Sequence, residues 1–182
     1  VNPEATVEVV WLNSWYDPAL EKTTALTLID KGCDVIAQHC DTTSPQVAAE
    51  EKGVFAIGYN SSTYDAAPNA YLTAPLFNWG VWYTQDVQSI IDGTWKAQRY
   101  WEGLNSGMVA LDKLSENCAE GTAEVVAEAE AKIKDGSLII FQGPLKDNKG
   151  NLVVSEGQVM TDGELESFNW FVEGVIGEVP AN

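Results

Sequence analysis

The sequence predicts an α/β fold built on a parallel sheet. Three apolar runs indicate strands, VEVVW (7–11), CDVIAQ (33–38) and VFAIG (54–58), and helical segments separate them. Each run stops in a polar or aromatic loop. Alternation of strand and helix indicates βαβ units, in which ligands bind beyond the carboxyl ends of the strands. The loops after the three runs therefore point to one candidate site.

Proline and glycine residues set the bounds of the first two helices. Asp17 before Pro18 predicts a helix N-cap, and Gly32 suits the end of that helix. The pair Ser44-Pro45 repeats the start signal, and the second helix stops at Gly53. We expect both helices to pack on the sheet.

The rest of the chain continues the α/β pattern less regularly. Further strands are expected over 70–73, 108–111, 138–141 and 152–154. A turn at 147–150 precedes the last of these strands. One helix is expected to end near Gly93 and another to span 122–134. A last helix, from Gly163 to about Gly174, follows a capping box of Thr161 and Glu164. It would place five apolar residues on one side: Leu165, Phe168, Phe171, Val172 and Val175.

These elements predict two parts. Residues 1–136 are expected to form the main α/β part, and residues 137–182 a C-terminal segment with a hairpin and an apolar helix. A strongly apolar helix needs a surface to cover. This helix either folds back on the main α/β part or belongs to a second domain that the chain lacks.

Charge and hydropathy exclude several classes of protein. The 27 acidic against 10 basic residues give a net charge of −17, which disfavours nucleic acid and anionic membranes as partners. No apolar run approaches the ~20 residues of a membrane span. The chain opens at Val1 without a basic and apolar leader, so we expect a processed or trimmed product.

Neither cysteine spacing nor a sequence motif predicts a metal or cofactor. Cys33 and Cys40 bracket one predicted strand and would lie over ~20 Å apart, beyond disulfide reach. The third cysteine could pair with at most one of them, and no pair has CxxC spacing. No glycine-rich phosphate loop follows the first strand.

An enzyme is the contrasting hypothesis. Asp17 and Asp41 could form an acid–base pair, and His39 beside Cys40 could indicate a nucleophile. Adjacent side chains on an extended chain diverge, however, which disfavours a pair formed by His39 and Cys40. A non-enzymatic binding protein is therefore the preferred interpretation.

Aromatic and amide side chains in the loops are the candidate ligand contacts. Trp15 and Trp79 could sandwich a flat ring, or could simply pack under their loops. The candidate set also contains side chains that can hydrogen-bond the edge of a heterocycle: Asp17, His39, Asp41, Tyr59, Asn60 and Asn78. For three of them a structural role competes: capping for Asp17 and Asn78, and hydrogen bonding for His39.

Several long stretches together resemble one known family. They are NSWYDPALEKTTALTLIDKGCDVIAQHCD, AAEEKGVFAIGYNS, YLTAPLFNWGVWYTQDVQSIIDGTWK, GLNSGMVAL, and FQGPLKDNKGNLVV with GQVMTDGELESFNWFVEGVIG. In this order the chain resembles the basic-membrane-protein family of ABC-transporter substrate-binding lipoproteins, related to purine-nucleoside receptors.

The resemblance implies a type I periplasmic-binding-protein fold with two lobes, of which this chain resembles the second plus the return segment. In these terms residues 1–136 would be the ligand-binding second lobe and residues 137–182 the return segment. The family's lipobox cysteine and first lobe have no counterpart here. Because a return helix of this family packs on the first lobe, we expect self-association of the chain through its apolar helix, or exchange of that helix between two copies. The implied function is capture of a purine base or nucleoside between the lobes, for an ABC permease outside the cytoplasm. The alternatives are a sensing or dimerisation module of the same fold and, less expected, a nucleoside hydrolase.

The resemblance also bears on the ligand. Implied contacts lie at 13–17, 39–42, 59–60 and 77–79. Many nucleoside-binding relatives have an acidic residue at the position of Asn60 and a lysine near Asn78, and both are amides here. That difference leaves a purine base or a similar small heterocycle open.

Overall fold

The computed structural model describes residues 2–180, which form two compact units. The larger unit comprises residues 14–134, and the smaller one joins the residues up to 13 with those from 135 onward. The sequence analysis had divided the chain after residue 136. The first thirteen residues, however, group with the C-terminal segment because they pair with a strand there.

A parallel sheet lies in the larger unit. Its strands are β2 (Val35–Ala37), β3 (Phe55–Ile57) and β4 (Tyr71–Thr73), in that order and all parallel. Helix α2 (Ser44–Lys52) connects β2 to β3. This is the predicted βαβ unit, so the α/β fold class with a parallel sheet is confirmed.

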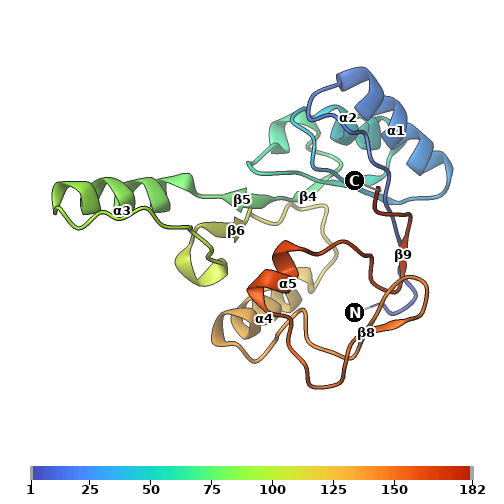
Figure 1. Cartoon of the computed structure of the whole chain (residues 1–182). Coiled ribbons are helices and arrows are strands. Elements are labelled where there is room, and N and C mark those ends of the chain that lie inside the picture. Colours follow the sequence, from blue (N-terminus) through green and yellow to red (C-terminus); the bar gives the residue numbers. More distant parts are fainter. Residues whose placement is uncertain (1, 181–182) are drawn as a thin grey trace. The chain divides into compact units, whose positions relative to one another are not determined.

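Small side chains form the core of this unit. Helix α1 (Pro18–Asp30) packs beside α2, as Figure 1 shows, and buries Ala25 against Ala48 and Ala49. Ile36 and Ala56 are the buried positions of β2 and β3. The alanine side chains are small, so the helices and the sheet can approach each other closely. Alternate residues of each strand face the opposite side of the sheet.

Both predicted helix starts are confirmed, with one difference in detail. The Asp17 carboxylate accepts the Leu20 N–H at 3.0 Å and caps α1. Helix α2 begins at Ser44, and the preceding Thr43 makes no side-chain cap. Gly53 ends α2 with φ of +71°, a conformation that glycine adopts without steric cost.

The remaining elements of the larger unit are less buried. Strands β5 (Pro75–Phe77) and β6 (Val109–Leu111) pair antiparallel, and α3 (Trp79–Ile91) lies between them in the sequence. Helix α4 spans Thr122–Asp135. Short 3₁₀ turns cover Tyr64–Ala66 and Leu104–Ser106. Neither α3 nor α4 has a buried residue.

The smaller unit corrects two strand predictions. Strand β1 (Val7–Glu8) pairs in parallel with β9 (Val175–Ile176), so 7–11 is not a strand of the β2–β3–β4 sheet. The Val7 N–H bonds the Gly174 carbonyl, which shows how the returning chain supplies the partner. Residues 138–141 form turns and irregular chain rather than a strand. The predicted hairpin is confirmed as β7 (Leu145–Lys146) with β8 (Leu152–Val154).

The predicted helix over 163–174 is wrong. The Thr161–Glu164 capping box forms, but α5 covers only Asp162–Glu166. The Phe168 ring packs edge-on against Phe141, with centroids 5.4 Å apart, and the Phe171 ring stacks with Trp11 at 6.4 Å. The apolar side chains thus belong to different elements that contact their own unit. The long apolar helix from which we predicted self-association is therefore not formed among the described residues.

Two further points concern the described residues. Cys33, Cys40 and Cys118 are all free thiols. No helix within residues 2–180 combines the length and the apolar character that crossing a membrane requires.

Candidate functional site

A row of aromatic rings crosses the ends of the strands in the larger unit. His39 follows β2 and Tyr59 follows β3, and their rings stack with centroids 4.6 Å apart and planes at 21°. Tyr59 meets Phe77 edge-on at 6.4 Å, and Phe77 meets Trp79 at 5.8 Å. The sequence analysis named His39, Tyr59 and Trp79 as candidate contacts and included Phe77 in the implied range 77–79. The structure connects Tyr59 to Trp79 through Phe77.

Strand β5 reaches this row through a backbone bridge. Asn60 and Leu76 form an isolated parallel bridge, and the Phe77 N–H donates to the Asn60 carbonyl at 3.2 Å. Asn60 itself has φ of +67°, in the left-handed region that few side chains other than asparagine tolerate. Its exposed amide is therefore held next to the aromatic row by a constrained backbone.

Trp15 and Asp41 form a second group. The Asp41 N–H donates to the Trp15 carbonyl at 2.8 Å, which joins the loop before α1 to the loop after β2. Trp15 does not follow a strand of the sheet, contrary to expectation, so this bond and α1 position it. The Trp15 and Trp79 rings are 62% and 47% exposed. None of the ring contacts among the described residues joins one to the other.

Two of the candidate side chains, Asp17 and Asn78, each form a hydrogen bond within the protein. Asp17 is the cap of α1. Asn78 precedes α3, yet its side chain does not cap that helix and donates to the Gly107 carbonyl at 2.9 Å.

Sequence analysis missed a buried carboxylate beneath these loops. Glu21 is 1% exposed, and its two oxygens accept hydrogen bonds from the Asp17 N–H, at 2.9 Å, and from the Thr42 hydroxyl. Burial and the charge of Glu21 raise the pKa of the nearby Cys40 thiol. Glu21 stands four residues after the Asp17 cap, a spacing that puts both on one side of the first helical turn. That spacing was the feature of the sequence that could have indicated the role of Glu21.

A second buried side chain supports the loop after β3. Gln46 of α2 is fully buried, and its amide donates to the Thr63 hydroxyl at 2.9 Å. A Cβ atom on Gly58 would lie 2.6 Å from the Thr63 Oγ1 and 3.0 Å from the Gln46 Nε2. Glycine is therefore required where β3 turns into Tyr59 and Asn60.

A tyrosine–aspartate pair lies under the same sheet. The Tyr71 hydroxyl donates to the Asp112 carboxylate at 2.7 Å. Burial and this hydrogen bond raise the pKa of Tyr71 to about 12. Burial opposes ionisation of Asp112 too, but hydrogen bonds from Ser62 and Tyr71 outweigh it and lower the Asp112 pKa. The pair joins β4 to the chain after β6.

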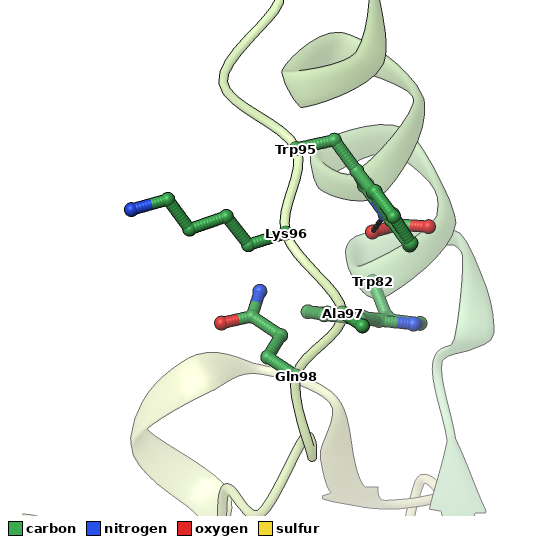
Figure 2. A pocket seen from close by; sticks show the side chains of 6 residues that line it. Trp82, Trp95, Lys96, Ala97 and Gln98 are labelled. Carbon is green, nitrogen blue, oxygen red and sulfur yellow. Dashed lines mark hydrogen bonds between the residues drawn. The ribbon is translucent and has the colours of Figure 1, made fainter.

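A separate groove lies along α3. It has a volume of about 230 Å³ and is lined by Trp82, Asp86 and residues 95–98. Figure 2 shows Trp82 and Trp95 on one side of it, with Lys96 and Gln98 directed away from them. None of the predicted site residues lines it. Within residues 2–180, no cluster of three or more histidine, cysteine or acidic residues could hold a metal ion.

Solved structures identify the class of fold. A transcriptional activator of the comK gene from Bacillus halodurans matches with a TM-score of 0.65 at 18% identity, covering 70% of this chain and 46% of its own. ABC-transporter solute-binding proteins from Conexibacter woesei and Aeropyrum pernix match with TM-scores of 0.58 and 0.57, also at 18% identity. They cover 71% and 73% of this chain, and 44% and 45% of their own. The fold is that of solute-binding proteins.

The chain belongs to the family of PnrA-like ABC transporter substrate-binding proteins, Bmp, which matches residues 1–143. A purine-binding protein of Brucella abortus (strain 2308) is 37% identical over 99% of this chain and 51% of its own length. A Haloferax volcanii protein, named as a candidate ABC transporter glucose-binding protein, is 35% identical over all of this chain and 44% of its own. The chain thus spans about half the length of these relatives.

Proposed function

We propose that the protein is the substrate-binding component of an ABC importer and that it holds a purine base between two lobes, one of which is the larger unit described above. The ligand lies on the strand-end loops, with its ring against Trp15 or Trp79 and its edge at Asp41, Asn60 and Asn78. Closure of the lobes around it would present the closed form to a permease outside the cytoplasm.

The aromatic row across β2, β3 and β5 is the observation that carries this proposal. A flat heterocycle gains ~1–3 kcal/mol from each aromatic face on which it stacks, whichever base it is. Trp79 is half exposed, and its ring contacts Phe77 at 5.8 Å and stacks with Tyr83 of α3 at 6.0 Å. A sugar could also lie on such a ring, which makes glucose the necessary competitor in any test.

Amides at two positions favour a base over a nucleoside. A carboxylate holds ribose hydroxyls better than an amide because hydrogen bonds to a charged acceptor are stronger. Asn60 and Asn78 instead offer both donors and acceptors, which match the mixed edge of a purine base. One N–H of the Asn78 amide donates to the Gly107 carbonyl, so in this proposal its second N–H and its oxygen meet the ligand.

We also propose that binding occurs without chemical change of the ligand. The Asp17 carboxylate is used as a helix cap. The His39 ring stacks on Tyr59, and burial and neighbouring charge raise the pKa of the Cys40 thiol, which disfavours the thiolate nucleophile. Incubation with adenosine should return it intact. Release of adenine, lost in Asp41→Asn, would move the protein to the hydrolases.

Titration of the full-length protein with adenine, adenosine and glucose tests the function. Adenine is expected to quench tryptophan fluorescence and to bind more tightly than adenosine, with no response to glucose. Tight glucose binding without adenine binding would contradict a purine ligand. Absence of all three responses would contradict a site made of these tryptophans.

A further inference from the structure

A buried carboxylate under the two loops has no assigned role. Among the described residues Glu21 and Gln46 are the buried polar side chains, and only Glu21 is charged. Removing a carboxylate from water is costly unless hydrogen bonds replace the lost hydration. Glu21 must therefore form hydrogen bonds that an apolar residue at this helix position could not form.

The partners of Glu21 come from both loops. One oxygen accepts the Asp17 N–H at 2.9 Å, and the other accepts the Thr42 hydroxyl. Beside this bridge, the Asp41 N–H donates to the Trp15 carbonyl at 2.8 Å. The carboxylate thus joins the loop carrying Trp15 to the loop carrying Asp41, within two residues of each.

The hydroxyl of Thr42 also connects Glu21 to the start of helix α2. Because its proton goes to Glu21, its oxygen can accept, and the Ser44 N–H donates to it at 3.1 Å, with the Ser44 hydroxyl oxygen also 2.9 Å away. Ser44 is the first residue of α2, whose N-cap Thr43 makes no side-chain bond. Glu21 therefore fixes the orientation of the Thr42 hydroxyl, which accepts the first backbone N–H of α2.

We propose that Glu21 is a positioning residue that, through Asp17 and Thr42, holds the Trp15 and Asp41 loops in the arrangement that binds ligand. Neither oxygen touches the ligand, and both are occupied by the protein. A carboxylate suits this task because both of its oxygens accept, so one takes the Asp17 N–H and the other takes the Thr42 hydroxyl proton.

Amide hydrogen exchange in the full-length protein tests this positioning without any ligand. In Glu21→Ala the Asp41 N–H, which does not bond Glu21, should exchange at least roughly tenfold faster, because its loop opens more often. The Ala56 N–H in the sheet core should be unchanged. Glu50→Ala is the matched control, since Glu50 also accepts a backbone N–H, from Asn69 at 2.7 Å, but away from these loops. If only the Asp17 N–H exchanges faster, Glu21 is a helix cap and the proposal is overturned.

A second pair of variants covers the case in which Glu21→Ala unfolds. Thr42→Val removes one bond of the bridge, whereas Thr42→Ser keeps the hydroxyl. Faster exchange of the Asp41 N–H in the first, restored in the second, supports the proposal. Equal exchange in Thr42→Val and the wild type overturns it.

Adenine affinity gives the functional readout and rests on the proposed function. Glu21→Ala and Thr42→Val should weaken adenine binding roughly tenfold, as expected for a misplaced stacking contact, with Thr42→Ser and Glu50→Ala near the wild type. If the wild type does not bind adenine, the purine proposal fails, and the exchange results decide on Glu21 by themselves. Unchanged affinity in Glu21→Ala, with faster exchange at Asp41, would overturn the role in binding.

Discussion

The imidazole ring of His39 stacks on the phenol ring of Tyr59, with centroids 4.6 Å apart. One residue follows β2 and the other follows β3, so the contact joins the ends of neighbouring parallel strands. Ligands of open α/β sheets bind at this edge. The stack therefore organises the side of the unit on which we place the ligand.

Removing either proposed stacking ring should weaken ligand binding. Trp15→Ala and Trp79→Ala are each expected to raise the adenine dissociation constant by the equivalent of ~1–3 kcal/mol. Trp101→Ala is the control, because Trp101 is as exposed as Trp79 but contacts Arg99 rather than the aromatic row. Calorimetric titration gives the three constants, and unchanged values for both Trp15 and Trp79 would contradict the stacking arrangement.

A single charge at Asn60 should change the choice between base and nucleoside. Asn60→Asp places a carboxylate on a backbone already held with φ of +67°, which aspartate also tolerates. We expect the adenosine-to-adenine affinity ratio to rise roughly tenfold, since charge-assisted hydrogen bonds to ribose are about twice as strong as neutral ones. Competition binding with both ligands measures the ratio. A constant ratio would remove Asn60 from the specificity determinants.

The Cys40 thiol should report the charge of Glu21. An ordinary thiol has a pKa of ~8.5. Burial, and then the Glu21 carboxylate, raise the pKa of Cys40, so its thiolate forms at a higher pH. In Glu21→Gln the negative charge is lost, and the pKa of Cys40 should fall. The pH dependence of iodoacetamide labelling at Cys40, followed by mass spectrometry, gives both values. Glu50→Gln should leave the Cys40 profile unchanged, and a shift there would indicate a general loosening.

The parallel core could be predicted from the sequence because its signals are local. Asp17 and Gly53 act at single turns, and the apolar runs at 35–37 and 55–57 are bounded on both sides. The partner of Val7–Glu8 could not be predicted, because it lies at Val175–Ile176, far along the chain. Apolar periodicity after the Thr161 cap likewise indicated a helix, yet tertiary contacts of Phe168 and Phe171 end it at Glu166.

The candidate site could likewise be predicted only where the sequence signals are local. Residues that directly follow β2 and β3, His39 and Tyr59, are in contact as expected. The roles of Glu21 and Gln46 depend on hydrogen bonds across elements, which periodicity does not encode. Whether Trp15 faces a ligand remains a prediction, because its position depends on the bond to Asp41 rather than on a strand end.

Substitution of Gly58 should destabilise the fold where β3 turns into the site. In Gly58→Ala the new Cβ would lie 2.6 Å from the Thr63 Oγ1, with Gln46 and Ala74 also at 3.0 Å. Overpacking of this kind typically costs ~1–3 kcal/mol. Urea unfolding should show that loss, whereas Gly80→Ala, with nothing near its Cβ, should show none. Equal stability of the two variants would mean that Thr63 moves aside freely.

Alkaline unfolding should depend on the Tyr71–Asp112 pair. The pKa of Tyr71 is about 12 in the folded chain, above the ~10 of an unfolded tyrosine. The neutral phenol therefore stabilises the fold fully below pH ~10, and this contribution is lost as the pH rises through the folded value. At neutral pH Tyr71→Phe should lower the free energy of unfolding by about 1–2 kcal/mol, because one hydrogen bond to Asp112 is lost.

The difference between wild type and Tyr71→Phe should then shrink between pH ~10 and 12, since only the wild type has this phenol to ionise. Urea denaturation at a series of pH values measures it. Tyr83→Phe is the control, because Tyr83 is 58% exposed on α3 and its removal should leave the free energy of unfolding nearly unchanged at every pH. A stability difference for Tyr71→Phe that stays constant across this range would show that the Tyr71 hydroxyl ionises at the same pH in the folded and unfolded chains, and that burial beside Asp112 does not resist its charge.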